Sequence, residues 1–230
     1  MKTVGMLGGM TWASSAVYYE LLNRAVQERM GGLHSAKTLM YSFDFAEIAA
    51  LQDAGRWDDA TRAMQAAGRM LRQGGADFLI ICCNTMHRMS DAVARAAEIP
   101  LLHIADPLAD AIGRQHIARV GLIGSRHTMT DDAIIKGRLR QRGIDVLVPE
   151  GEDFDRIDRI VYAEMAKGRF LEESRREASA IIAKMAAHGA RGIVLGCTEF
   201  PILLKADDAT VPLFDTTALH AAAAANLALA

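Results

Sequence analysis

Short apolar runs alternate with longer amphipathic stretches along this chain. The runs cover residues 3–7, 37–43, 78–82, 100–104, 119–123, 145–148, 192–195 and 211–214. Most of them end at Gly, Pro, Ser or Asn, which are typical of loops. Because each run is continuously hydrophobic instead of alternating with polar residues, the pattern predicts strands that are buried on both faces, as in a parallel sheet.

Three of the stretches between the runs have apolar residues at helical spacing. The first begins near Ser14 or Ser15, the second covers residues 58–73, and the third covers residues 172–188. Strands that alternate with helices of this length predict an α/β architecture.

The chain also contains an internal repeat. Residues 75–83 match residues 189–197 without a gap, and each segment ends in a cysteine at an offset of 114 residues (197 against 83). Residues 4–9 match 120–125, and residues 99–102 match 211–214, at nearly the same offset. Strands of α/β proteins resemble one another in composition, but that does not explain a cysteine at the same place in both halves.

The repeat predicts two similar α/β lobes with parallel sheets, related by a pseudo-twofold axis, with the active site in the cleft between them. We expect the first lobe to cover residues 1–102 and the second to cover residues 103–215. The C-terminal helix, residues 216–230, is expected to pack with the first lobe.

Cys83 and Cys197 end equivalent strands, and ligands of open parallel sheets bind beyond the carboxyl ends of the strands. Two thiols that approach one carbon from opposite sides could remove a proton from one face and return a proton to the other. A thiol suits this work because its reference pKa, about 8.5, lies near neutrality and is tunable. A buried cysteine is otherwise a small hydrophobic residue, which is the role we expect for Cys82.

Other chemistry has less support in the sequence. Adjacent Cys82 and Cys83 do not have the spacing of a redox motif, and of the seven scattered histidines only His87 lies within helical reach of a cysteine, so we expect no metal site. The glycines of residues 5–9 do not match a nucleotide-binding pattern.

Composition narrows the class of protein further. The chain has 26 basic and 28 acidic residues, a net charge of −2, and is 51% hydrophobic, which argues against disorder and against a nucleic-acid partner. The longest apolar runs are far shorter than the roughly 20 residues that cross a bilayer. With three cysteines and no signal-peptide pattern, we expect a soluble, cytoplasmic globular protein that has no membrane partner.

Several motifs, in order along almost the whole chain, resemble those of the aspartate/glutamate racemase family. They are Gly8-Gly9-Met10-Thr11-Trp12, Tyr18-Tyr19, Leu22-Asn23, Cys83-Asn84-Thr85-Met86-His87, Thr128-Met129 and Gly196-Cys197-Thr198-Glu199. The resemblance implies a homodimeric amino-acid racemase that uses no cofactor, pyridoxal phosphate included, and moves the α-proton between two cysteines. Some relatives lack one cysteine and act preferentially on one enantiomer. This chain keeps both, which favours racemisation in both directions.

Residues beside the cysteines are candidates for holding the substrate. Removal of the α-proton places charge on the substrate carboxylate, which hydrogen-bond donors stabilise. Asn84 and Thr85 follow Cys83, and Thr198 follows Cys197, so we assign the α-carboxylate to them, although the same residue types cap helices. Met10, Thr11 and Thr128 lie in the loops after the first strand of each lobe. The threonines are expected to offer hydroxyls to the substrate, unless they serve only to form turns. Met10 is a further candidate for contact with the substrate, and the alternative is that it packs in the core.

The remaining candidates concern the substrate side chain and the protons. By resemblance, Gln52 and Lys167 match positions that face the cleft in relatives, and Arg56 is a weaker candidate. The alternative for Lys167 and Arg56 is an ordinary solvent-exposed side chain. Glu199 and His87 could relay protons or orient a thiol, or form structural hydrogen bonds. Trp12 could cover the ligand or pack in the core.

The sequence therefore predicts cofactor-independent racemisation of aspartate or glutamate. The same superfamily contains hydantoin racemases, maleate isomerases and decarboxylases, so another small acid or a hydantoin is the alternative substrate. A non-catalytic amino-acid-binding protein is the alternative from a different class, and the two retained cysteines argue against it. The sequence does not separate aspartate from glutamate.

Overall fold

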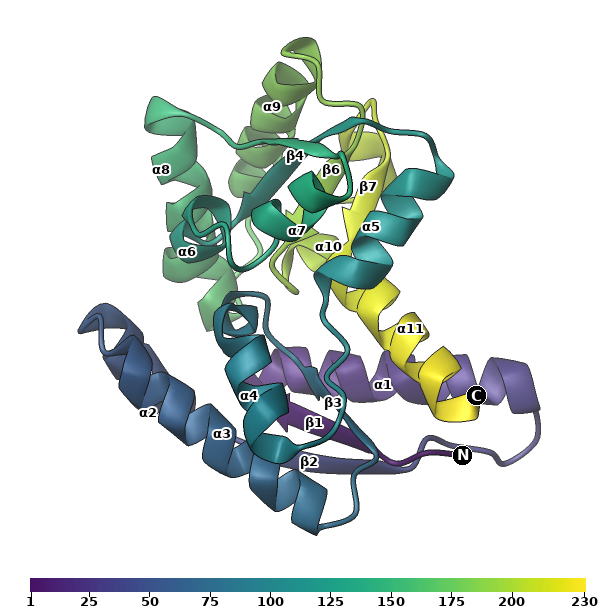
Figure 1. The fold of residues 1–230 in the computed structure, drawn as a ribbon. Coiled ribbons are helices and arrows are strands. Elements are labelled where there is room, and N and C mark those ends of the chain that lie inside the picture. The colour runs from purple at the N-terminus through teal and green to yellow at the C-terminus, as the bar shows by residue number, and fades with distance from the viewer. The chain divides into compact units, whose positions relative to one another are not determined.

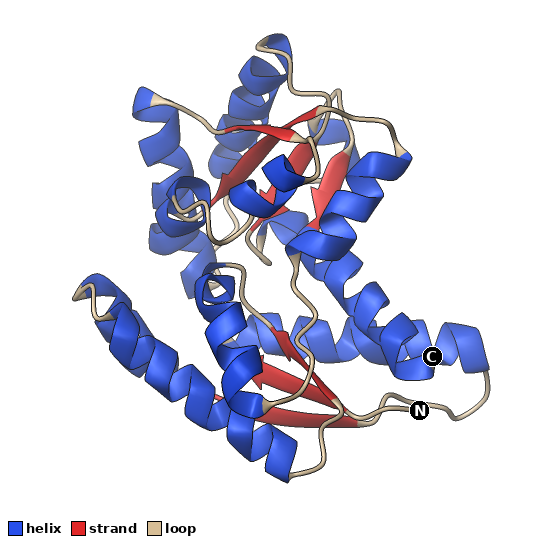
Figure 2. Ribbon diagram, in the orientation of Figure 1, coloured by secondary structure: helices blue, strands red, loops and turns tan.

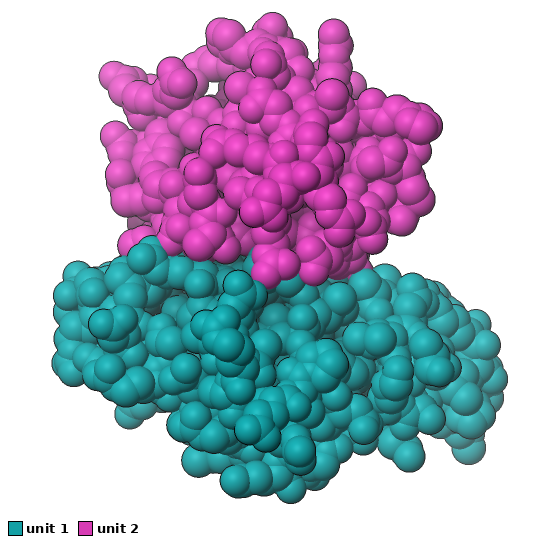
Figure 3. Space-filling view, in the orientation of Figure 1, with its two compact units in different colours: residues 1–104, 220–230 teal, residues 105–219 magenta.

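The computed structural model describes residues 1–230, which form two compact units (Figure 3). Unit 1 comprises Met1–Ile104 and His220–Ala230, and unit 2 comprises Ala105–Leu219. Each unit is an α/β structure around a parallel sheet (Figure 2). None of the helices combines the length and the apolar character that crossing a lipid bilayer requires.

Unit 1 has a three-stranded parallel sheet with the order β2-β1-β3 (Figure 1). Its strands are β1 (Val4–Gly8), β2 (Thr38–Ser42) and β3 (Phe78–Ile81). Its helices are α1 (Trp12–Met30), α2 (Phe45–Asp53), α3 (Trp57–Gln73), the 3₁₀-helix η1 (Thr85–Met89), α4 (Ser90–Ala97) and most of α11 (Thr216–Leu229).

Helices cover both faces of this sheet. Leu7, Leu79 and Ile81 pack with residues of α2, α3 and α4, whereas Met6 and Ile80 pack with residues of α1 and α11. Alternate residues of each strand therefore enter two different cores, which is why the strands are hydrophobic throughout.

Unit 2 has a four-stranded parallel sheet with the order β5-β4-β6-β7. Its strands are β4 (Arg119–Gly124), β5 (Asp145–Leu147), β6 (Ile193–Gly196) and β7 (Leu213–Asp215). Its helices are α5 (Ala105–Arg114), α6 (Arg126–Thr130), α7 (Lys136–Gln141), α8 (Gly151–Arg159), the π-helix η2 (Ile160–Glu164), the 3₁₀-helix η3 (Met165–Lys167), α9 (Glu172–Ala187), α10 (Phe200–Leu203) and the 3₁₀-helix η4 (Ala206–Asp208). Two buried clusters, one with α8, α9 and α10 and one with α5 and α7, cover its faces.

The structure confirms the predicted strands with one exception. The run at residues 100–104 forms only a single parallel bridge, from Leu79 to Leu101. Leu79 donates to the Pro100 carbonyl over 2.8 Å and accepts from the Leu102 amide over 2.9 Å. Pro100 has no amide hydrogen to donate, and the chain turns at Ile104 into α5, so the ladder stops after one residue.

The repeat in the sequence is also a repeat in local geometry. Gly75 and Gly189, which follow α3 and α9, both have φ of +98°. Gly5 and Gly121 occupy equivalent positions in β1 and β4, where an added Cβ would lie 2.6 Å and 2.7 Å from a side chain of the neighbouring strand. Both units thus use glycine at the same turn and at the same close approach between strands.

The close packing at the carboxyl end of β1 can be tested at Gly9. Its φ is +90°, and an added Cβ would lie 2.3 Å from the carbonyl oxygen and 2.4 Å from the amide nitrogen of Phe43. We expect Gly9→Ala to lower the free energy of unfolding by about 3 kcal/mol or more, because the contact is with backbone that cannot rotate away.

The matched control is Gly113→Ala, since Gly113 lies in α5 with no atom within 4 Å of an added Cβ. That variant should be neutral or stabilised by up to about 1 kcal/mol. Urea unfolding followed by circular dichroism measures both. Equal stability of the two variants would contradict the close packing at Gly9.

Candidate active site

Two adjacent cysteines at the end of β3 differ in their surroundings. Cys82 continues the ladder, donating its amide to the Leu7 carbonyl over 2.9 Å, and its side chain is fully buried in the core with α1 and α11. Burial raises the pKa of the Cys82 thiol far above its usual range, and the neighbouring Cys83 raises it further. Cys82 is therefore a neutral core residue, as predicted, whereas Cys83 is only half-buried.

His87 lies one helical turn beyond Cys83 and is almost completely buried. Its Nδ1 lies 2.9 Å from the carbonyl oxygen of Cys83. Because a carbonyl oxygen only accepts, Nδ1 carries the hydrogen, and Nε2 has no hydrogen-bond partner. The imidazole thus holds the backbone from which the Cys83 thiol projects.

Burial lowers the pKa of His87 well below its ordinary value, and the neighbouring His103 and His220 rings lower it further. The ring centroids lie 4.7 Å from that of His103 and 5.5 Å from that of His220. His87 is therefore neutral near pH 7 and serves as a hydrogen-bond donor to the Cys83 backbone.

His220 of α11 completes this group of rings within unit 1. It lies between the Tyr18 hydroxyl, 3.0 Å from Nδ1, and the Leu102 carbonyl, 2.9 Å from Nε2. The carbonyl requires Nε2–H, so Tyr18 donates to Nδ1. Burial lowers the pKa of His220 to about 4. These contacts join α1, α11 and the segment after the Leu101 bridge.

The loop after β1 holds two of the predicted substrate residues. Met10 is buried, and Thr11 is half-buried and caps α1 by accepting from the Ser14 amide over 3.3 Å. Ser15, which the sequence analysis did not select, accepts from the Gly9 amide over 2.7 Å and donates to the Thr11 carbonyl over 3.1 Å. The sequence offered one sign of this role, namely that Ser15 lies at the start of a predicted helix.

The other predicted residues of unit 1 are divided between the interior and the surface. Asn84 and Thr85, which follow Cys83, are buried. The amide of Gln52 is also buried and lies 3.1 Å from the sulfur of Met86, a neighbour of the Cys83 segment. Arg56 is exposed and pairs with Asp59 over 2.7 Å.

Trp12, by contrast, is 77% exposed, so the alternative that it packs in the core is wrong.

In unit 2 the candidate groups form a compact cluster after β6. The half-buried Cys197 thiol donates to Oε2 of Glu199 over 2.9 Å, and the Thr198 hydroxyl donates to the same oxygen over 2.7 Å. Thr198 and Glu199 are each about nine-tenths buried. A carboxylate is thereby aimed at the thiol and fixed by a second donor.

Thr128 lies near this cluster but is completely buried. Its hydroxyl is 3.1 Å from that of Ser125, which caps α6, and its methyl group packs against Gly124 and Gly196 at the ends of β4 and β6. Ser125 was not selected from the sequence, although a serine directly before a helix is a recognisable cap.

Lys167 lies elsewhere in unit 2, at the end of the 3₁₀-helix η3. Its side chain is exposed, and it forms no ion pair. Gly168, with φ of +71°, ends the helix directly after it. Across the chain, no group of three or more His, Cys, Asp or Glu side chains is arranged to hold a metal ion.

The histidines of unit 1 predict how stability depends on pH. The folded state keeps His220 neutral down to about pH 4, whereas in the unfolded chain it takes up a proton below about pH 6.5. Unfolding therefore gains a proton in this window, and the stability that is present above pH 6.5 is lost as the pH falls toward 4. We expect His220 alone to remove about 2 kcal/mol between pH 7 and about pH 4.5.

Urea unfolding at both pH values measures this loss. His220→Gln, which keeps a donor toward Leu102 but does not titrate, should show a smaller loss than the wild type by that amount. His34→Gln, at an exposed position, is the control and should match the wild type. An unchanged loss in His220→Gln would contradict the neutral state of His220.

Comparisons with known proteins agree with this arrangement. The family model for Asp/Glu/Hydantoin racemase matches residues 7–224. A candidate Asp/Glu racemase from Yersinia pestis has a similar crystal structure, with a TM-score of 0.94 and 44% identity over 100% of both chains. An aspartate racemase homologue from Pyrococcus horikoshii OT3 gives 0.86 and 29%, again over 100% of both chains. The broad specificity amino-acid racemase RacX of Bacillus subtilis strain 168 is 21% identical over 75% of this chain and 74% of its own length. This chain therefore belongs to the Asp/Glu/Hydantoin racemase family, and its class of reaction is that of an amino-acid racemase, an isomerase.

Proposed function

We propose that this protein racemises an acidic amino acid, aspartate or glutamate, without a cofactor, and that Cys83 and Cys197 are its acid and base. The observation that carries the proposal is the repeat. Each unit ends an equivalent strand with a half-buried thiol, at the edge of the sheet where ligands of parallel sheets bind. An aspartate racemase homologue among the similar structures supports the class of substrate.

The reaction requires only the movement of protons. One cysteine, as the thiolate, removes the α-proton and leaves a carbanion whose charge spreads onto the α-carboxylate. The other cysteine, as the thiol, donates its proton to the opposite face of the same carbon. The product is the mirror image, and the protonation states of the two cysteines are exchanged. Turnover in the reverse direction, or exchange with water, restores them, and no electrons are transferred.

Glu199 supports the role of Cys197 in this scheme. Its carboxylate accepts the hydrogen bond of the thiol, so it is in place to take the proton as the thiolate forms. The Thr198 hydroxyl on the same oxygen keeps the carboxylate oriented. In unit 1 the supporting group acts on the backbone of the cysteine instead of its thiol, since His87 donates to the Cys83 carbonyl.

The substrate carboxylates need hydrogen-bond donors and a cation. We assign the α-carboxylate to Asn84, Thr85 and Thr198, which directly follow the two cysteines. Lys167 is proposed to bind the side-chain carboxylate, because its exposed ammonium is not engaged by an acidic residue, and Gln52 is the proposed second donor. Recognition of this carboxylate would separate acidic substrates from the wider range implied by the name of the Bacillus subtilis relative.

The cysteines provide the test. Cys83→Ala and Cys197→Ala should each lower the rate of racemisation of aspartate or glutamate at least about 10³-fold, because each variant lacks either the proton acceptor or the proton donor. Chiral chromatography of the two enantiomers measures the rate.

Cys82→Ala is the matched control, since it removes a neighbouring thiol that is buried and neutral. Its activity should remain close to that of the wild type. Racemisation by either single-cysteine variant would contradict the two-base scheme. A loss in Cys82→Ala as large as that in Cys83→Ala would show that the wrong thiol was assigned.

A further inference from the structure

Helix α8 does not simply stop before the loop that leads to α9. It continues into one turn of π-helix, η2, and then into the 3₁₀-helix η3, which ends at Lys167. Wide and narrow helical turns in direct succession are uncommon, and π turns are frequent at functional sites. The helical backbone of this segment therefore departs from α geometry. The π turn ends three residues before Lys167, which the proposed function uses.

Glu164 is the last residue of the π turn, and its side chain is only 8% exposed. Ile160, Val161 and Met165 on either side of it belong to the core of unit 2. Burial of a carboxylate among apolar side chains is unfavourable unless hydrogen bonds and an opposite charge compensate it.

Both oxygens of Glu164 are compensated. Arg159 donates to Oε1, and the buried Ser174 of α9 donates its hydroxyl to Oε2. Arg159 also pairs with Glu177 of α9. Glu164 thus ties the end of the π turn to both α8 and α9.

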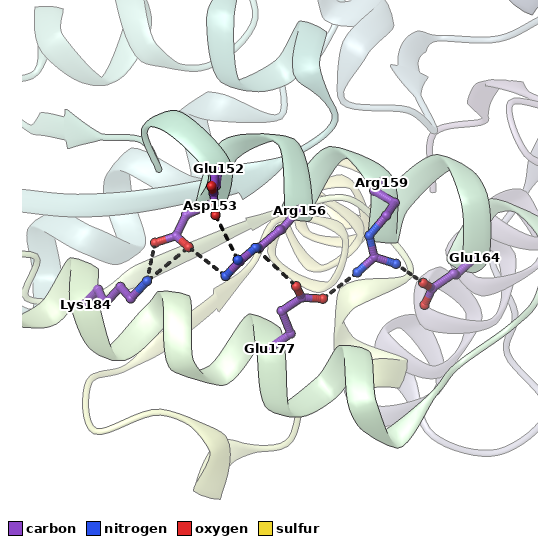
Figure 4. Close-up of polar contacts among 7 residues, drawn as sticks. All are labelled: Glu152, Asp153, Arg156, Arg159, Glu164, Glu177 and Lys184. Atoms are coloured by element: carbon purple, nitrogen blue, oxygen red, sulfur yellow. Dashed lines mark hydrogen bonds and ion pairs between the residues drawn. The ribbon is translucent and has the colours of Figure 1, made fainter.

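Figure 4 shows that the contact between Arg159 and Glu164 ends a row of ion pairs along α8 and α9. The other members are more exposed; the Glu152 side chain, for example, is 86% exposed where it meets Arg156. Exposed pairs contribute little to stability, because water screens their attraction. Glu164 is the member whose loss would remove the partner of a buried group, the Ser174 hydroxyl.

The backbone of Glu164 closes the same turn. Its carbonyl accepts from the Arg169 amide over 3.0 Å, and the Met165 carbonyl accepts from the Gly168 amide over 2.9 Å. Lys167 lies between these bonds, and no ion pair holds its side chain. The turn therefore sets the backbone position from which the Lys167 side chain projects, and Glu164 anchors that turn.

We propose that Glu164 is a positioning residue, which holds the turn bearing Lys167 and so sets the affinity for substrates with a side-chain carboxylate. This inference rests on the proposed role of Lys167. A stability role alone would not require a carboxylate, since well-packed apolar residues are often as stabilising as a buried ion pair. A turn that must be held in place next to a substrate-binding lysine does need a hydrogen-bonding group here, which Arg159 and Ser174 both contact.

A double-mutant cycle with steady-state kinetics tests the proposal, using whichever of aspartate and glutamate the wild type racemises faster. Glu164→Ala should raise KM about tenfold and change kcat less than about threefold, because the turn loosens but the cysteines are untouched. Ser174→Ala, a milder change at the same carboxylate, should raise KM in the same direction. Glu164→Gln, which keeps a hydrogen-bonding group in place, should retain most of the wild-type affinity.

The decisive comparison is with Lys167→Met. That variant should raise KM by at least as much, and adding Glu164→Ala to it should have no further effect, because the ammonium that Glu164 positions is gone. Glu152→Ala, in the same ion-pair row but exposed, should match the wild type.

The positioning role would be overturned if Glu164→Ala raised KM by the same factor in the wild type and in Lys167→Met. It would also be overturned if Glu164→Ala lowered only kcat. An unchanged KM in Lys167→Met would overturn it as well. Failure of the proposed function would look different, because the wild type itself would then racemise neither amino acid.

Discussion

The arrangement of this protein depends on parallel strands that are covered by helices on both faces. A parallel ladder needs every strand to run in the same direction, so all strands of a sheet end at one edge. In unit 1 that edge carries Gly9, Thr11 and Cys83, and in unit 2 it carries Ser125 and Cys197. The chemistry-bearing residues of each unit come together because the backbone pairing leaves them no other edge.

The same pairing separates two adjacent thiols. Cys82 still belongs to the ladder, and its side chain enters the core with α1 and α11, where burial keeps it protonated. Cys83 comes one residue later, where the chain leaves the sheet, and packs at the margin of the opposite core. A single step along the chain therefore separates a buried core residue from the half-buried thiol that we propose as an acid and base.

Much of this could be predicted from the sequence, because the signals are local. Continuous apolar runs marked all seven strands, and the repeat marked the two cysteines as equivalent. The run at Pro100 was predicted to be a strand but forms only one bridge. Hydrophobicity does not show that the chain leaves the sheet after Leu102. The exposed position of Trp12 was left open for a similar reason: an aromatic side chain fits a core or a surface equally well by composition.

The residues that were missed act through tertiary contacts. His220 lies 133 positions after His87 in the sequence, and nothing local indicates that their rings lie 5.5 Å apart. Glu164 is one of many acidic residues on amphipathic helices, and only the fold shows that it is buried against Ser174. Such residues contact the candidate site residues or their backbone. Sequence motifs that mark the site residues therefore do not reveal the residues that support them.

The central claim is that two different cysteines handle the proton on the two faces of the substrate. The most direct measurement is a brief incubation of the protein with the L-enantiomer of aspartate or glutamate in heavy water, followed by chiral separation and proton NMR. The account predicts deuterium at the α-carbon of the D-product, while the remaining L-substrate keeps its original hydrogen, because acceptor and donor are separate thiols. Deuterium entering the L-substrate as fast as the D-product forms, or D-product that retains the original hydrogen, would contradict it.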